Sequence, residues 1–173
     1  MRAARILLPA IQSDLRAVVS GSATSMEAPL SQIYLLLTGL AAENLAKAVI
    51  VAGRDAVVTD DRLADDLKTH WLLDLIRRAG VVLSEEDSHL VERLEAHVTW
   101  AGRYPIPAKL DDFLPRQHPS GGFGSLAHFV SSDPDRVEAL IEQLRLAVDM
   151  AERVRRAGSA GRASNVPDNL PPD

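Results

Sequence analysis

Hydrophobic residues recur every three or four positions through most of this chain, which is the spacing of one face of an α-helix. Strands would show alternating hydrophobic and polar positions, and no run of useful length does so. We therefore expect an all-α fold, an up-and-down bundle of about five helices. The helical pattern covers residues 3–20, 30–53, 69–79, 84–100 and 133–157. It predicts one domain over residues 1–157, followed by a flexible tail at 158–173.

Residues with special backbone preferences mark several ends of these helices. Gly53 and Gly80 stand where a helix commonly stops. Thr69 is in position to cap the third helix, and Ser84, with an aspartate three residues later, resembles a capping box for the fourth. Pro9 lies inside the first segment, so it should kink that helix or mark its true start.

Residues 102–131 differ from the rest of the chain because they are rich in proline and glycine and lack a periodic pattern. A loop of this length in a compact domain is usually functional or mobile. The pair Asp133-Pro134 then opens the last helix, with proline at the first helical position.

Composition narrows the class of protein. The chain has 173 residues, 25% charged and 46% hydrophobic, which is typical of one globular domain with a proper core. Its net charge of −5 argues against binding nucleic acid over the whole surface. The absence of cysteine excludes disulfides, thiolate metal ligands and cysteine nucleophiles. No signal peptide is evident, and the apolar run 33–42 is too short to cross a bilayer, so we expect a cytoplasmic protein.

The second segment is apolar on almost every side, yet Glu43, Asn44 and Lys47 lie at its centre. A helix that is apolar all round is a buried one, and burying such polar groups is costly unless they are paired. Glu43 and Lys47 are four residues apart, in the favourable order for a helical ion pair. The three residues form either a structural polar network, which is the commoner case, or a binding or catalytic site.

A family resemblance appears in the same region. The peptide AAENLAKAVIVA resembles the central helix of HEPN domains, which often have a small residue, a glutamate, a spacer and then Lys-Ala. The following THWLLDL is similar to a His-x-x-Leu segment found in many HEPN proteins. The resemblance covers about residues 31–157. It implies a HEPN-like bundle, and it implies a homodimer, since relatives of this family commonly dimerise.

The resemblance also implies a possible activity, because many HEPN proteins are metal-independent ribonucleases. In these an arginine precedes a histidine by four to six intervening residues, and the pair acts on the ribose 2′-hydroxyl and the scissile phosphate. This sequence lacks that spacing. The three Arg-to-His pairs have seven, three and one residues between them: Arg62 and His70, Arg93 and His97, Arg116 and His118.

Arg93 and His97 remain candidate catalytic residues because they are one helical turn apart and face the same way. An imidazole beside a guanidinium could act as a general base near a phosphate. However, His97 belongs to the apolar stripe of its helix, and a buried core histidine is the commoner explanation.

The peptide from Trp100 to Pro107 gathers the most unusual residues of the chain. Trp100 and Tyr104 flank Arg103, a third catalytic candidate, and the two prolines keep the segment extended. The aromatic residues either close the bundle while Arg103 pairs with an acid such as Glu43, or they stack on a base while Arg103 binds a phosphate or carboxylate.

His70, at the start of the third helix, can point at Glu43 or Glu95. The five histidines show no metal-ligand spacing, so neither a metal nor another cofactor is expected. The residues expected to form a binding site are Glu43, Asn44, Lys47, His70, Trp100, Arg103 and Tyr104. Of these, Glu43, Lys47, His70 and Arg103 should converge in one polar pocket.

Two functions stay open at this point. The first is a divergent HEPN-like module that dimerises through helices including the central one and binds a protein, nucleotide or RNA. The resemblance alone would place such a module in a stress, defence or toxin–antitoxin setting. The second is an atypical ribonuclease that uses Arg103 and His97 with Glu43 and Lys47. The missing Arg–His spacing favours the first.

Overall fold

The computed structural model describes residues 1–21, 28–54, 58–59, 62–101, 114–117, 121, 123–124 and 129–163. These residues form five α-helices, which confirms the all-α class. The helices are α1 (Arg2–Val19), α2 (Ala28–Ala52), α3 (Leu72–Arg78), α4 (Glu85–Ala96) and α5 (Asp133–Ala163). A short 3₁₀ turn, η1 (Asp65–Leu67), precedes α3, and a turn of π-helix, η2 (His97–Ala101), continues α4.

The loops add two pairings that the hydrophobic pattern does not reveal, because each strand has only two residues. The first is antiparallel between β1 (Val58–Thr59) and β2 (Arg62–Leu63). The second is antiparallel between β3 (Arg116–Gln117) and β4 (Phe123–Gly124).

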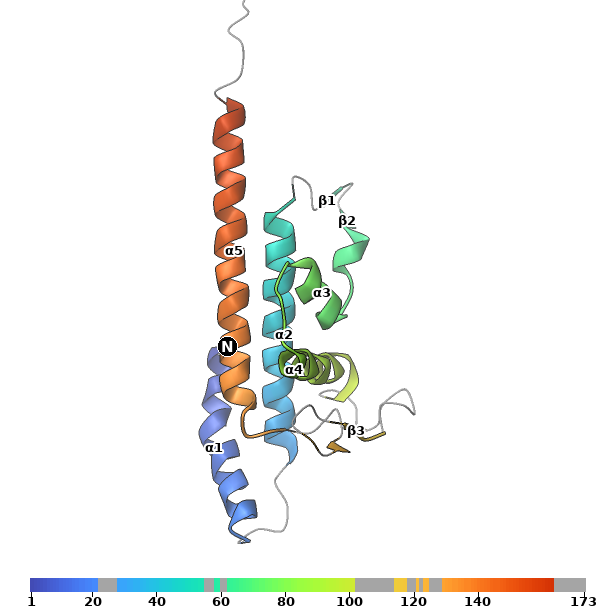
Figure 1. Ribbon diagram of the computed structural model, residues 1–173, viewed down its shortest axis with the longest axis vertical. Helices are drawn as coiled ribbons and strands as arrows, with labels where there is room; N and C mark the ends of the chain where they lie inside the picture. Colours follow the sequence, from blue (N-terminus) through green and yellow to red (C-terminus); the bar gives the residue numbers. More distant parts are fainter. Residues whose placement is uncertain are drawn as a thin grey trace, which may run out of the picture.

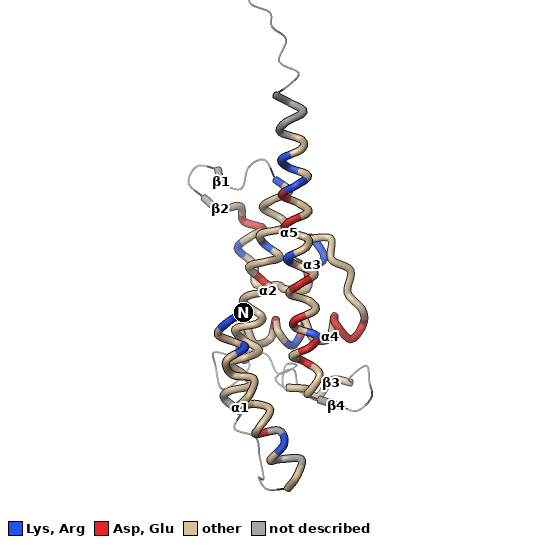
Figure 2. The backbone as a smooth tube through the Cα atoms, turned by 90° about the vertical axis from the view of Figure 1, so that its left-hand side faces the viewer, with Lys and Arg blue, Asp and Glu red and all other residues tan. Residues whose placement is uncertain are grey.

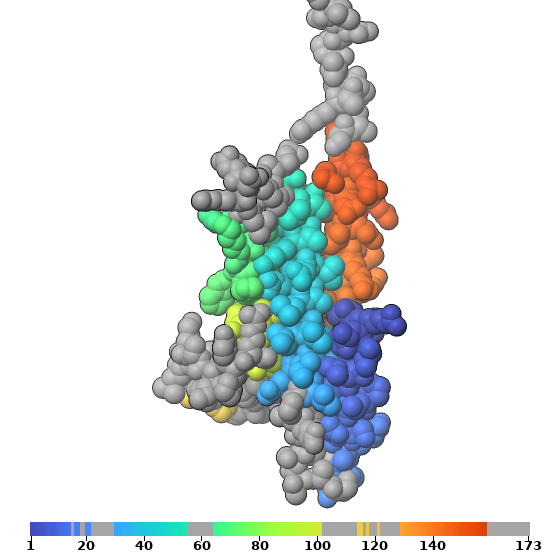
Figure 3. Space-filling view, turned by 180° about the vertical axis from the view of Figure 1, so that it is seen from behind, coloured from blue at the N-terminus to red at the C-terminus, as the bar shows by residue number. Residues whose placement is uncertain are grey.

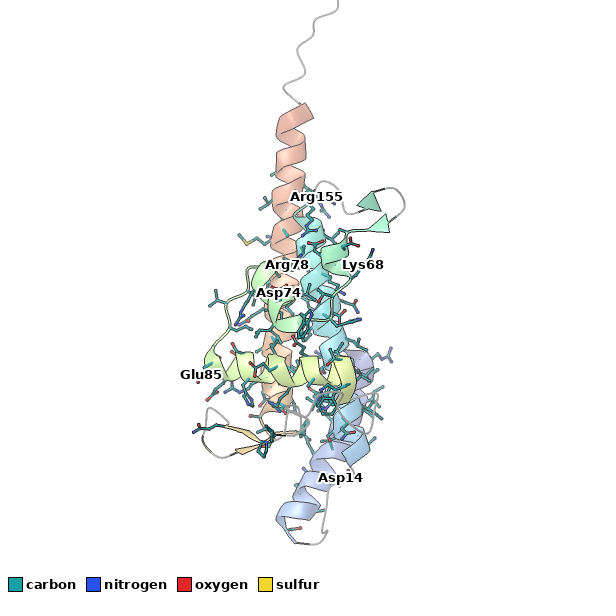
Figure 4. The ribbon with its side chains drawn as sticks, turned by 90° about the vertical axis from the view of Figure 1, so that its right-hand side faces the viewer. Asp14, Lys68, Asp74, Arg78, Glu85 and Arg155 are labelled. Carbon is teal, nitrogen blue, oxygen red and sulfur yellow. The ribbon has the colours of Figure 1, made fainter. Side chains whose placement is uncertain are left out.

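α2 is the centre of the fold (Figure 1), with α1 and α5 along one side and α3 and α4 on another. Figure 2 shows α5 reaching beyond the other helices at one end and α1 at the opposite end. α5 runs in the same direction as α2, and α4 lies across both of them (Figure 4). The expected up-and-down order is therefore wrong, because the long connection after η2 returns the chain to the start of α2.

The helix ends agree with the sequence where a cap is present. Ser84 Oγ accepts a hydrogen bond from the Asp87 amide at 3.1 Å, so α4 has the predicted cap. Gly80 has a φ of 75°, and the Val81 amide behind it donates to the Ile76 carbonyl at 3.2 Å, which ends α3 as predicted. α2 also ends just before Gly53.

Three boundaries differ from the prediction. α3 begins at Leu72 rather than 69, because the Thr69 hydroxyl accepts from the Trp71 amide before the helix starts. α1 continues through Pro9, so this proline does not mark its start. α5 extends past residue 157 to Ala163, and 158–163 are helical rather than a flexible tail. The remainder of the predicted tail, 164–173, lies outside the described residues, as does most of the 102–131 loop.

The core lies between α2 and the helices that surround it. Its fully buried side chains come from all five α-helices and η1: Ile11 of α1, Tyr34 and Leu35 of α2, Leu67 of η1, Leu72, Leu75 and Ile76 of α3, Leu90 and Leu94 of α4, and Ile141 and Leu144 of α5. By length and composition alone, Leu30–Ala52 would also pass as a bilayer-spanning helix, in contrast to the expectation from residues 33–42. Half of that stretch is buried in the protein, and the core helix of a soluble protein meets the same criteria.

Gly39 allows α4 to approach α2 closely. A Cβ atom at this position would lie 2.7 Å from Val98 Cγ2 and 2.9 Å from the Leu94 carbonyl oxygen. Because one of these neighbours is backbone, it cannot rotate away as a side chain would. The crossing of α2 and α4 therefore depends on a residue without a side chain at position 39.

Gly39→Ala should destabilise the protein by about 1–3 kcal/mol, because overpacking at the crossing outweighs the roughly 1 kcal/mol gained in helix propensity. Gly53→Ala is the control, since its nearest atoms are 3.7 Å away, and it should change stability by less than about 0.5 kcal/mol. Urea unfolding measures both. A Gly39→Ala variant as stable as the wild type would contradict the packing described here.

Candidate functional site

Glu43, Lys47 and His70 form one polar cluster, named here the Glu43 cluster. Lys47 Nζ donates to Glu43 Oε1 at 2.7 Å. His70 Nδ1 lies 3.1 Å from both carboxylate oxygens of Glu43. The Glu43 side chain is only 6% exposed, whereas those of Lys47 and His70 are 20% and 52% exposed. The buried Glu43 carboxylate thus binds the Lys47 ammonium and the His70 imidazole, and both of these groups reach solvent.

The local structure explains how these residues meet. Glu43 and Lys47 are one turn apart on α2, and this spacing makes their side chains neighbours. His70 lies between η1 and α3, and α3 is anchored by buried Leu72, Leu75 and Ile76. The sequence left open whether His70 points at Glu43 or at Glu95. In the structure His70 contacts Glu43, and the Glu95 carboxylate accepts a hydrogen bond from the Leu73 amide at 3.1 Å. Partial burial raises the pKa of Glu95.

The cluster orients an imidazole. An N–H at Nδ1 of His70 that donates to the Glu43 carboxylate leaves Nε2 as the acceptor nitrogen of a neutral ring. Carboxylates commonly fix the tautomer and direction of a functional histidine in this way. With a neutral imidazole, the charges of Glu43 and Lys47 cancel. The arrangement suits proton exchange or a hydrogen bond to a polar ligand better than the capture of an anion by charge alone.

Asn44 does not belong to the cluster. Successive helical residues point about 100° apart, so Asn44 faces away from Glu43 and is exposed. It lies within an apolar surface that we name the α2 face, formed by Ile33, Leu37, Leu40, Asn44, Ala48 and Val51. The expectation that all three central polar residues of α2 are buried is therefore wrong for Asn44.

Arg93 and His97 are both buried in the core. The Arg93 guanidinium donates to the two Asp133 carboxylate oxygens, at 2.7 Å and 2.5 Å, and the exposed fractions of these side chains are 3% and 0%. His97 Nδ1 donates to the Arg93 carbonyl at 2.8 Å, and burial lowers the pKa of this histidine. Arg93 therefore joins α4 to the start of α5, and His97 is the core histidine that its stripe position suggested.

Asp133 is the partner that sequence reasoning missed. Besides binding Arg93, its carboxylate accepts from the Val130 amide at 2.7 Å, just before α5. The Asp-Pro pair signalled a helix start, but nothing in the sequence connects it to an arginine 40 positions away. The sequence did contain one indication of a buried ion pair, because Arg93 lies on the same face of its helix as Leu90 and Leu94.

The remaining candidates are only partly described. Trp100 is half-buried in η2, and Arg103 and Tyr104 lie outside the described residues. The structure thus brings together three of the four residues expected in the polar pocket and does not describe the fourth. Within the described ranges, no three His, Asp or Glu residues are grouped as a metal site would require.

Removing one member of the Arg93–Asp133 pair should destabilise the protein more than removing Glu43 from the Glu43 cluster. Arg93→Met leaves Asp133 buried and unpaired, so it should destabilise the protein by about 3–5 kcal/mol. Glu43→Ala should cost about 1–3 kcal/mol, because water can solvate Lys47 and His70. Arg145→Met removes an exposed arginine from α5 and serves as the control. Urea unfolding gives the ranking, and a Glu43→Ala variant less stable than Arg93→Met would contradict it.

Comparison with known proteins identifies no relative of this chain. No family model matches the chain, and neither the curated proteins nor the solved structures include a significant match. The likeness to HEPN domains thus rests on the short motifs of α2 and of the segment that leads into α3. The function has to be argued from the contacts and surfaces of this chain itself.

Proposed function

We propose that this protein is a divergent HEPN-like module of the cytoplasm that forms a homodimer through α2 and binds a partner molecule. The observation that carries the proposal is the α2 face. The stress, defence or toxin–antitoxin setting remains part of the proposal through the family resemblance alone.

The α2 face is unusually apolar for a surface. Ile33 is 42% exposed, Asn44 is exposed, and Leu37, Leu40, Ala48 and Val51 are each partly exposed. The 18-residue separation between Ile33 and Val51 corresponds to a strip about 27 Å long. Figure 3 shows α2, in cyan to teal, uncovered between α3 on one side and α1 and α5 on the other. Contiguous apolar strips of this kind mark interaction sites.

The order of residues on the α2 face favours a second copy of the chain as the partner. Leu40 and Ala48 are equally distant from Asn44, and so are Leu37 and Val51. A two-fold axis at Asn44 would therefore place each leucine against a smaller residue of the partner. The Asn44 amide both donates and accepts, so it can pair with its own copy. A single polar residue within an apolar helix contact fixes the register of such pairs.

The contacts of Arg93 and His97 support a binding role over the HEPN ribonuclease chemistry. A catalytic pair has to reach the substrate, yet both side chains are buried and Arg93 is committed to Asp133. The exposed imidazole of the Glu43 cluster is the group best placed to contact a small ligand or partner. Its hydrogen-bond partner Glu43 lies on α2, the helix that carries the α2 face.

Asn44→Glu should halve the mass of the wild-type assembly at micromolar concentration, because two carboxylates would be brought together and removed from water at the two-fold axis. Gln12→Glu adds the same charge to an exposed position on α1 and should leave the mass unchanged. Light scattering measures the mass, and circular dichroism checks that both variants fold. A monomeric wild type, or an Asn44→Glu variant of unchanged mass, would remove the proposal.

The purified protein should not cleave single-stranded RNA in the absence of metal at a rate that depends on His97. The reason is that the buried His97 ring and the Arg93 guanidinium have no access to a phosphate. The assay compares the wild type with His97→Gln and Arg103→Ala. Cleavage by the wild type that both substitutions abolish would establish the ribonuclease instead.

A further inference from the structure

The second half of α5 exposes three large hydrophobic side chains on one line, named here the α5 stripe. Leu146, Met150 and Val154 are 59%, 69% and 64% exposed. They are spaced by four residues, so they follow one another along a single side of the helix. The buried residues Ile141 and Leu144 of α5 belong to the core, so α5 has a second apolar surface besides the one that packs on α2.

The α5 stripe lies where the helix leaves the bundle. Figure 1 shows α5 continuing past the end of α2, and Figure 2 shows basic residues near this projecting end. A helix with an exposed line of leucine, methionine and valine is rarely left in water, because each side chain gains from burial. Binding of a partner to the stripe is therefore expected, and the order of residues along the stripe indicates the identity of that partner.

We propose that the α5 stripe binds the same stripe of a second copy of this chain, with the two helices antiparallel. Leu146 and Val154 are equally distant from Met150, so a two-fold axis at Met150 sets Leu146 against Val154 of the partner subunit. Met150 then meets its own copy at the centre, where its flexible side chain can adapt to the space.

Charge complementarity selects the antiparallel direction. Asp149 and Arg153 lie on the same flank of the stripe, are both exposed, and form no ion pair among the described residues. In an antiparallel pair the same flanks face each other, so Asp149 lies against Arg153 of the partner subunit, and the reverse pair forms as well. In a parallel pair this flank would face the small residues Ala147 and Ala151, and neither ion pair would form.

This contact is independent of the α2 face because it uses another helix. Together the two contacts join dimers into a larger assembly, and each can be broken without the other. The variant Asn44→Glu, which removes the α2 contact, should therefore still associate through α5. Conversely, Met150→Glu should remove the α5 contact and leave the α2 dimer intact.

Disulfide cross-linking tests the contact directly, because the chain contains no cysteine. Met150→Cys, mildly oxidised, should form a disulfide dimer, since the two-fold axis brings the two Cα atoms within about 7 Å. Ala139→Cys is the matched control on the same side of α5, and in an antiparallel pair it lies far from its own copy. Cross-linking of Ala139→Cys as fast as Met150→Cys would indicate a parallel pair. A Met150→Cys protein that stays uncross-linked would exclude the contact altogether.

A charge exchange tests the partner's identity in the Asn44→Glu background. Asp149→Arg should raise the dissociation constant of the α5 dimer by about tenfold, because it replaces two ion pairs with two repulsions. Adding Arg153→Asp should restore the original value, because the ion pairs then form in reverse. Analytical ultracentrifugation measures both constants. An Asp149→Arg variant that the second change fails to rescue would contradict the antiparallel self-pairing, and an Asn44→Glu protein that is monomeric would show that α5 binds something other than this chain.

Discussion

α2 carries hydrophobic side chains around its whole circumference, and every other helix is placed so as to cover part of it. α1 and α5 cover one side, and α4 crosses close to its backbone at Gly39. α3 and the segment just before it, which includes His70, cover the side of α2 that carries Glu43. Because the burial of apolar surface is the main driving force of folding, the side of α2 that the other described residues leave uncovered would gain stability from contact with a partner.

The two internal ion pairs serve different purposes in this arrangement. Arg93 and Asp133 are wholly removed from water and hold α4 against the start of α5. Such a pair adds little net stability over a hydrophobic contact, but losing one member is costly, so it fixes which surfaces meet. The Glu43 cluster instead has a buried carboxylate and exposed partners. It joins α2 to the segment before α3 while keeping the His70 ring open to solvent.

Local features of the sequence were sufficient for the helices and for the Glu43–Lys47 pair. Ser84 begins α4 and Gly80 ends α3 as their residue types predict, since a hydroxyl caps an amide and glycine accepts a positive φ. Non-local features were not predictable. The approach of α4 at Gly39 and the Arg93–Asp133 pair depend on segments far apart in the chain, and the direction of α5 depends on the long connection before it.

The exposure of Asn44 was missed but could have been predicted from the sequence. Neighbouring residues of a helix point about 100° apart, so Asn44 could not share the buried side of Glu43. The helical course of residues 158–163 is the opposite case. Its glycines at 158 and 161 argue for a helix end, yet α5 continues through them.

The proposed dimer depends on the α2 face meeting a second copy of itself. The most direct measurement is an isotope-filtered nuclear Overhauser experiment on a mixture of labelled and unlabelled protein, which detects only contacts between subunits. The expected result is a contact between the methyl groups of Leu40 and Ala48 of the partner subunit. A self-associated sample in which the methyl groups of α2 show no contact between subunits would contradict the account.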